Sequence, residues 1–200
     1  IRMWLFCEGQ NIPEFDTNGN VIGTDKANTL IKDLTLYLQA AAQQNVLVFL
    51  SLWNGAVGIK GDEAGIITDD KKMQTFIDNA LIPMVNALKN ETALGGWEIM
   101  NEPEGSVAVA SNSEPCYNTS RLQNSGAGWT GSNIPIQNLQ RFANKLASAI
   151  KTADPKALVT IGSWSERAST NSFGYFNYWS DECLQKAGGE SNGIFDFYQI

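Results

Sequence analysis

Hydrophobic residues in this chain fall into two alternating patterns. Short, continuous apolar runs predict β-strands buried on both faces, and they occupy residues 1–6, 46–53, 97–101, 157–163 and 195–200. Between these runs, apolar residues recur every three or four positions, which predicts amphipathic helices over residues 25–44, 69–89 and 135–153, with a shorter helix over 180–186. Pro83 predicts a kink in the second helix, because proline removes a helical hydrogen bond.

The alternation of buried strands and helices predicts a parallel sheet covered by helices. Strands of this kind could form an open doubly wound sheet or part of a barrel. No Gly-x-Gly-x-x-Gly lies at a strand-to-helix turn, so the fingerprint of a dinucleotide fold is missing. Long loops such as residues 105–133 follow the strands, on the side where barrels place active sites. We therefore predict an α/β fold, a (β/α)8 TIM barrel of which about five strands are present, with residues 1–200 as part of a single domain.

The strand at 97–101 ends at the string Asn101-Glu102-Pro103. Pro103 cannot donate to a sheet and biases Glu102 toward an extended conformation. The Glu102 carboxylate is therefore expected at the carboxyl end of a buried strand, where barrel enzymes carry their catalytic groups. The alternative is an ordinary strand-end carboxylate that faces solvent.

The string Gly95-Gly-Trp-Glu-Ile-Met-Asn-Glu-Pro-Glu-Gly105 resembles the acid/base motif of the family 5 glycoside hydrolases. It looks most like that of the mollusc-type endo-β-1,4-mannanases of the family. The resemblance implies that the chain contains barrel strands two to six, with Glu102 as acid/base at the end of strand four. The nucleophilic Glu, at the end of strand seven, is then expected after Ile200.

The resemblance also implies roles for two polar neighbours of Glu102. Arg2 corresponds to the strand-two arginine that hydrogen-bonds the nucleophile; alternatively it is a buried ion-pair partner, for instance of Glu98. Asn101 corresponds to the asparagine that binds the 2-hydroxyl of the sugar, and is otherwise a plain strand-end cap. Glu98 itself is expected to be structural and deeper in the barrel.

Other carboxylates and tryptophans lie at or near strand ends. We expect ordinary loop carboxylates, with the cleft as the alternative, at Glu8, Glu104 and Glu166. Aromatic rings bind the C–H faces of sugars, and the tryptophans expected to do so on the active side are Trp53, Trp129 and Trp164. Trp4 and Trp97 lie within strands and are expected in the core, whereas Trp179 could serve either purpose.

Composition narrows the possible partners. The net charge is −7 and no basic run exists, so nucleic acid and anionic membranes are poor partners. No apolar run is long enough to span a membrane. Histidine is absent, which excludes a Ser-His-Asp or Cys-His triad from these residues and makes a zinc site unfavourable. We expect no cofactor and no metal.

Cysteines and sequons point to an oxidising compartment. Cys116 and Cys183 lie in polar loops, where a free thiol would be a liability, and we predict that they form a disulfide; Cys7 is expected to be a packed thiol. Asn90-Glu-Thr and Asn118-Thr-Ser are glycosylation sequons. Together these features predict a secreted, extracellular protein, which we expect to be a monomer.

The predicted function is that of a retaining endo-acting hydrolase of β-1,4-mannosidic bonds in mannan, galactomannan or glucomannan. Two alternatives stay open at this point. One is an endo-β-1,4-glucanase on the same barrel, because the Asn-Glu-Pro motif does not distinguish mannose from glucose. The other is a barrel without catalytic activity that binds carbohydrate.

Overall fold

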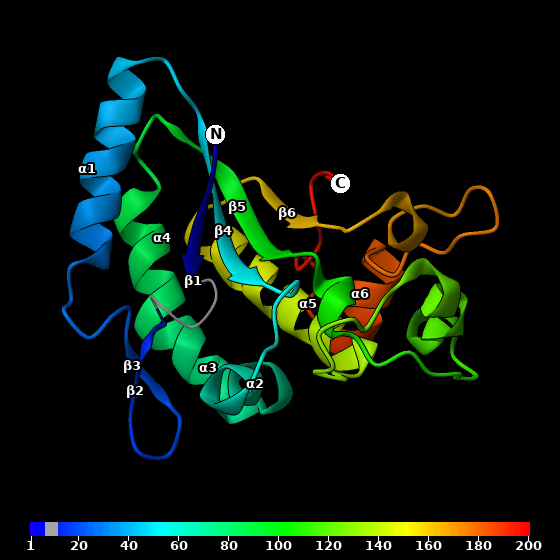
Figure 1. The fold of residues 1–200 in the computed structure, drawn as a ribbon. Helices are drawn as coiled ribbons and strands as arrows, with labels where there is room; N and C mark the ends of the chain where they lie inside the picture. The colour runs from blue at the N-terminus through cyan, green and yellow to red at the C-terminus, as the bar shows by residue number, and fades with distance from the viewer. Residues whose placement is uncertain (7–11) are drawn as a thin grey trace.

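The structure, a computed structural model, describes residues 1–6 and 12–200. Its centre is a parallel sheet with the strand order β1-β4-β5-β6 (Figure 1). The strands are β1 (Arg2–Phe6), β4 (Val48–Asn54), β5 (Leu94–Asn101) and β6 (Val159–Gly162). The predicted parallel sheet is present. Strands β4, β5 and β6 are mostly buried, as their apolar runs predict, whereas only Leu5 and Phe6 of β1 are buried.

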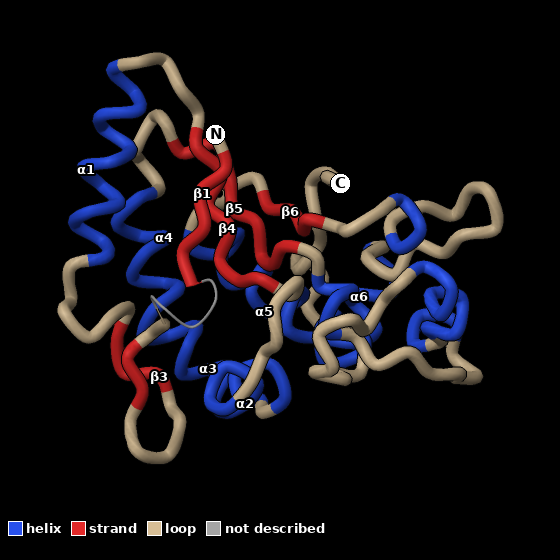
Figure 2. Tube along the Cα trace, in the orientation of Figure 1, coloured by secondary structure: helices blue, strands red, loops and turns tan. Residues whose placement is uncertain are grey.

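Register brings the carboxyl ends of the strands together. Trp53 pairs with Met100 and Asn54 with Asn101, while Asn101 also pairs with Gly162 of β6. The loops that follow β4, β5 and β6 therefore leave the sheet at one edge. Figure 2 shows the long loops after β5 and β6 extending on the same side of the molecule, where Thr119–Ser125 and Glu166–Ala168 are in contact.

Helix α4 packs against α1 and α5, and α5 packs against β5 and β6 of the sheet (Figure 1). The helices are α1 (Leu30–Gln43), α2 (Gly61–Thr68), α3 (Asp70–Phe76), α4 (Ile82–Leu88), α5 (Ile136–Ala153) and α6 (Asp181–Gly188). Short 3-10 helices lie at Pro103–Ser106, Pro115–Tyr117, Thr119–Ser125 and Glu166–Ala168. In the part of the chain that the structure describes, no helix is long and apolar enough to cross a membrane.

The first helix begins later than predicted. We expected a start at Asp25, but α1 starts at Leu30. The carboxylate of Asp25 accepts hydrogen bonds from the backbone N–H groups of Thr29 and Leu30, at 3.0 and 3.1 Å. Asp25 therefore lies outside the helix and accepts hydrogen bonds from backbone N–H groups at its start, as a capping residue does.

The second predicted helix is interrupted rather than simply kinked. A π-helical turn, Ile77–Leu81, separates α3 from α4. Pro83 follows this turn and has no N–H to donate to the carbonyl of Asn79, so the regular hydrogen-bond ladder cannot run through it. The π-helical turn accommodates the proline. The apolar face continues through this turn, where Ile77, Ala80 and Leu81 are buried.

The last predicted strand, residues 195–200, is reduced to a single parallel bridge between Gly162 and Gln199. Two backbone hydrogen bonds hold it, from the N–H of Asp196 to the carbonyl of Val159 at 2.9 Å and from the N–H of Ser163 to the carbonyl of Gln199 at 3.0 Å. Side chains add two more: the carboxylate of Asp196 accepts the N–H of Val159 at 2.7 Å, and the hydroxyl of Thr160 donates to the carbonyl of Phe197 at 2.7 Å. The segment therefore lies beside β6, but the prediction of a strand over residues 195–200 is wrong.

Two further elements were not predicted. A small hairpin of β2 (Glu14–Phe15) and β3 (Val21–Gly23) lies between β1 and α1. Helix α2 lies between β4 and α3, and its two glycines are poor helix formers. Burial of Ile66 and Ile67 explains why this helix forms despite its low propensity.

The predicted disulfide joins Cys116 to Cys183. It connects the long loop after β5 to α6 across 67 residues of sequence. Replacing both cysteines by serine is expected to lower the free energy of unfolding by about 2–4 kcal/mol, because the unfolded chain regains the freedom that the cross-link removes. Urea unfolding measures this loss, and reduction of the unaltered protein serves as the control. A loss well below 1 kcal/mol would contradict the expectation.

Candidate active site

Glu102 directly follows β5, where the carboxyl ends of the strands lie side by side. Its backbone is left-handed, with φ 44° and ψ 54°, and the 3-10 helix Pro103–Ser106 begins at the next residue. The expected extended conformation is therefore wrong. The chain reverses at this point, with the N–H of Glu102 bonded to the carbonyl of Gly162 at 2.5 Å and the N–H of Gly105 to that of Glu102 at 3.0 Å. A glutamate in this region costs about 1–3 kcal/mol, and such residues cluster at functional sites.

Tight packing holds this strained turn in place. A Cβ atom on Gly105 would lie 2.5 Å from the ring of Trp129, so only glycine allows this approach. The hydroxyl of Ser106 donates to the carbonyl of Gly55 at 2.9 Å, which ties the turn to the loop after β4. Glu102 thus sits on a rigid support. Its own carboxylate has no hydrogen-bond partner among the residues described.

A polar network connects β1, β4 and β5 and includes Asn101, which is next to Glu102 in the sequence. The guanidinium of Arg2 forms a two-pronged ion pair with Glu98, whose side chain is fully buried. Arg2 also donates to the amide oxygen of Asn101 at 2.6 Å, and Asn101 donates to Asn54 at 2.9 Å. The ion pair that was the alternative for Arg2 is therefore present. The predicted contacts of Arg2 with the nucleophile and of Asn101 with the sugar stay predictions.

Two predicted aromatic platforms lie side by side near the turn. Trp129 and Trp164 are 43% and 42% exposed, and their ring centroids are 5.6 Å apart with a tilt of 54° between the planes. The indole N–H of Trp129 donates to the carbonyl of Ala56 at 3.0 Å. One ring comes from the loop after β5 and the other from the loop after β6. Both present surface to solvent, as a sugar-stacking residue must.

The fold also buries a carboxyl group that was expected to be an ordinary loop carboxylate. Glu104 is 2% exposed, and this expectation is wrong. Its Oε1 accepts hydrogen bonds from the hydroxyl of Ser163 at 2.8 Å and the indole of Trp179 at 3.0 Å, and its Oε2 accepts the N–H of Trp164 at 3.0 Å. Burial raises the pKa of the Glu104 carboxyl, and these hydrogen bonds lower the pKa by less.

Comparison with known proteins gives the family. The model of the cellulase family, glycosyl hydrolase family 5, matches residues 13–182. The chain belongs to glycosyl hydrolase family 5.

Relatives of this family 5 chain are named as mannan endo-1,4-β-mannosidases. The protein from Mytilus edulis is 52% identical over the whole of this chain, and that from Cryptopygus antarcticus is 48% identical. The chain spans 55% and 52% of these two relatives, or about half their length.

Solved structures agree with this assignment. An endo-1,4-β-mannanase from Eisenia fetida is 55% identical, with a TM-score of 0.96 over 98% of this chain and 55% of that one. A β-mannanase from the mussel Mytilus edulis is 52% identical, with a TM-score of 0.93 over 100% of this chain and 57% of that one. The predicted fold class is confirmed: the partial parallel sheet belongs to a (β/α)8 barrel.

Not all predicted tryptophan positions fit this family 5 site. Trp53, expected to be a platform, is 5% exposed and packs against Phe6 and Phe76, with ring centroids 5.2 and 5.3 Å away. A stacking platform needs a free ring face, so this burial argues against the expected role.

The other tryptophans divide between core and surface. Trp97 is fully buried, as expected, and Trp179 is fully buried too. Trp4, expected in the core, is 37% exposed, with the guanidinium of Arg2 4.9 Å from its ring centroid. It lies on β1, the edge strand of the described sheet, so neighbouring strands cover it on one side only.

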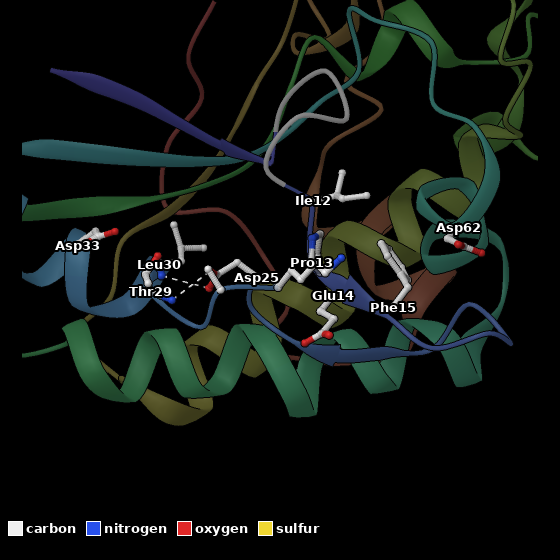
Figure 3. Close-up of a pocket in the computed structure, with 11 residues that line it drawn as sticks. Ile12, Pro13, Glu14, Phe15, Asp25, Thr29, Leu30, Asp33 and Asp62 are labelled. Carbon is white, nitrogen blue, oxygen red and sulfur yellow. Dashed lines mark hydrogen bonds between the residues drawn. The ribbon is translucent and has the colours of Figure 1, made fainter.

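A cavity of about 960 Å³ lies elsewhere in the family 5 chain, between the β2–β3 hairpin and the start of α1 (Figure 3). Figure 3 shows Ile12, Phe15 and Asp62 along it, together with Asp25 and its hydrogen bonds to Thr29 and Leu30. Among the residues that the structure describes, neither Glu102 nor any other predicted site residue lines this cavity. It is therefore separate from the candidate site.

The two sequons differ in their surroundings. Asn90 is exposed just after α4. Asn118 is half-buried beside the disulfide, and its side-chain oxygen accepts a hydrogen bond from the hydroxyl of Ser120 at 2.7 Å. Cys7 and Glu8 lie outside the described residues. Within the described ranges no cluster of three or more metal-ligating side chains occurs.

The raised pKa of Glu104 predicts a pH effect on stability. As pH rises through the ordinary pKa of 4.5, the unfolded chain loses its proton at this position before the native carboxyl does, because burial raises the native pKa. Native Glu104 then binds more protons than unfolded Glu104, so its contribution to the free energy of unfolding falls as pH rises until the native pKa is passed. The Tm of the unaltered protein is expected to fall from pH 4 to pH 7 relative to that of Glu104→Gln, which cannot titrate. Parallel Tm curves would contradict this.

Proposed function

We propose that these residues form the acid/base side of the active site of a retaining endo-β-1,4-mannanase. The observation that carries the proposal is the position of Glu102. It follows a buried parallel strand in a strained, tightly packed turn, with Asn101 fixed by Arg2 on one side and an exposed tryptophan pair nearby. The two relatives named above are mannan endo-1,4-β-mannosidases, which supports mannan over glucan.

In the proposed reaction, Glu102 first acts as an acid. It gives its proton to the departing glycosidic oxygen while a second carboxylate attacks the anomeric carbon and forms a glycosyl-enzyme intermediate. Glu102 then takes a proton from the incoming water, whose oxygen displaces the second carboxylate, so the configuration is retained. The two carboxyl groups of such enzymes are about 5–5.5 Å apart. We expect the second group after Ile200.

The neighbouring groups assist by position and charge. Asn101 is held at the edge of the site and is proposed to bind the 2-hydroxyl of the sugar, an interaction that strengthens in the transition state. Trp129 and Trp164 are proposed to stack on the sugar rings, whose C–H faces match aromatic surfaces. None of these steps uses a cofactor.

Release of reducing sugar from galactomannan and from carboxymethyl-cellulose tests the proposal on the full-length protein. Rapid release from galactomannan with little from carboxymethyl-cellulose is the expected result. The opposite order supports an endo-glucanase instead. Binding of either polysaccharide without release supports a barrel that only binds carbohydrate.

We propose further that the protein is secreted, glycosylated at Asn90 and monomeric. The disulfide supports an oxidising compartment, and the exposure of Asn90 favours it over Asn118. A mass decrease at the Asn90 peptide on enzymatic deglycosylation tests the modification, and the mass in solution tests the oligomeric state.

A further inference from the structure

We propose that Glu104 is a positioning residue that sets the place of Trp164 for polysaccharide binding; this rests on the proposed function. Glu104 is the second carboxylate of the Asn-Glu-Pro-Glu string, two residues after Glu102. Glu102 is half-buried, whereas Glu104 is 2% exposed. It therefore acts through other groups and does not itself touch the reacting atoms.

The contacts of Glu104 identify those groups. Its Oε2 accepts the backbone N–H of Trp164 at 3.0 Å, at the point where the loop after β6 begins. Its Oε1 is shared by Ser163 and by the indole of Trp179. All three partners are uncharged. Burying a carboxyl group costs free energy unless it is hydrogen-bonded. The three donors supply these hydrogen bonds, so Glu104 and the segments that carry the donors are held together.

The same short helix links Glu104 to the acid/base. Glu104 lies in Pro103–Ser106, which follows Glu102 directly. Its own carbonyl accepts the N–H of Gly128 at 2.8 Å, in the loop that carries Trp129. One residue therefore connects the acid/base turn to the loops that carry Trp129 and Trp164. The side chain of Glu104 fixes the Trp164 backbone, and the ring of Trp164 is 42% exposed beside that of Trp129.

A double-mutant cycle tests whether Glu104 acts through Trp164. Binding of mannohexaose is measured by calorimetry on the full-length protein carrying Glu102→Gln, in which hydrolysis is expected to be slow. Glu104→Met removes all the acceptors at similar size and is expected to raise the Kd about tenfold, the order of magnitude of a lost buried hydrogen bond. In a Trp164→Ala background the same change is expected to raise the Kd by less than about twofold.

Controls separate positioning from general damage. Glu182→Gln removes one negative charge from an exposed site on α6 (side chain 80% exposed) and is expected to leave the Kd unchanged. If Glu104→Met does not fold, Glu104→Gln takes its place, because its amide group keeps one acceptor and leaves at least one N–H donor unpaired. A Kd increase of about threefold is then expected.

Two results overturn the inference: an unchanged Kd in the Glu104 variants, or the same increase with and without Trp164. Either result is distinct from failure of the proposed function. That function fails if the unaltered protein releases no sugar from mannan, whereas the binding cycle can still be measured and still decides the role of Glu104.

Discussion

Replacing Glu102 by Gln is expected to lower the kcat for galactomannan by about 10²–10⁴-fold, the range over which general acid–base catalysis contributes. Glutamine has nearly the shape of glutamate but cannot donate a proton to the leaving oxygen. The turn itself is held by backbone bonds and by the packing of Gly105 and Ser106, not by the carboxylate, which has no hydrogen-bond partner among the residues the structure describes. Stability and mannohexaose affinity are therefore expected to change little.

Initial rates with galactomannan, together with the Tm, provide the measurement. Glu166→Gln is the matched control, because it changes an exposed carboxylate in the loop after β6. If the Glu102→Gln variant cleaves galactomannan at the rate of the unaltered protein, Glu102 is not the acid/base. A large fall in Tm would show instead that the carboxylate supports the fold.

Replacing Arg2 by Met is expected to lower the free energy of unfolding by about 3 kcal/mol or more, because it leaves a buried carboxylate without its cation. Glu98 is fully buried and is bound by Arg2 and by the side-chain amide of Gln199. After the change only the neutral Gln199 remains as a bonded partner among the described residues. Asn101 also loses a hydrogen bond from Arg2, so we expect weaker activity as well.

Urea unfolding of the full-length protein measures the loss. The double variant Arg2→Met with Glu98→Gln buries no charge, and we expect it to recover part of the stability lost in the single variant. A single variant within about 1 kcal/mol of the unaltered protein would mean that water or another group compensates Glu98. If the double variant recovers no stability, the loss in the single variant comes from the missing shape of the Arg2 side chain and not from the unpaired charge of Glu98.

The order of strands and helices can be predicted from the sequence because the apolar residues follow a regular pattern in each element. Apolar runs such as residues 46–53 can form only a covered strand, and the spacing in 135–153 allows only one apolar helix face. The position of Glu102 at a strand end is equally local information, since Pro103 ends the strand. These features need no knowledge of distant residues.

The errors arise where distant contacts override local preference. Glu102 takes a left-handed conformation because the packing of Gly105 against Trp129 and the bond from Ser106 to Gly55 fix the turn around it. Glu104 is buried because the loops after β6 bring three donors to it, none of them near it in the sequence. Trp53 looks like a strand-end platform, but Phe76 from α3 packs against it. No local signal reveals these contacts.

The site loops are bonded to one another as well as to the sheet. Trp129, after β5, donates to Ala56 after β4, and Glu104, after β5, holds Trp164 after β6. Each segment thus takes its shape from a neighbour that leaves a different strand. Engineering that transplants a single one of these loops from another enzyme would leave donors and acceptors without their counterparts, so altered specificity calls for exchanging all three as one unit.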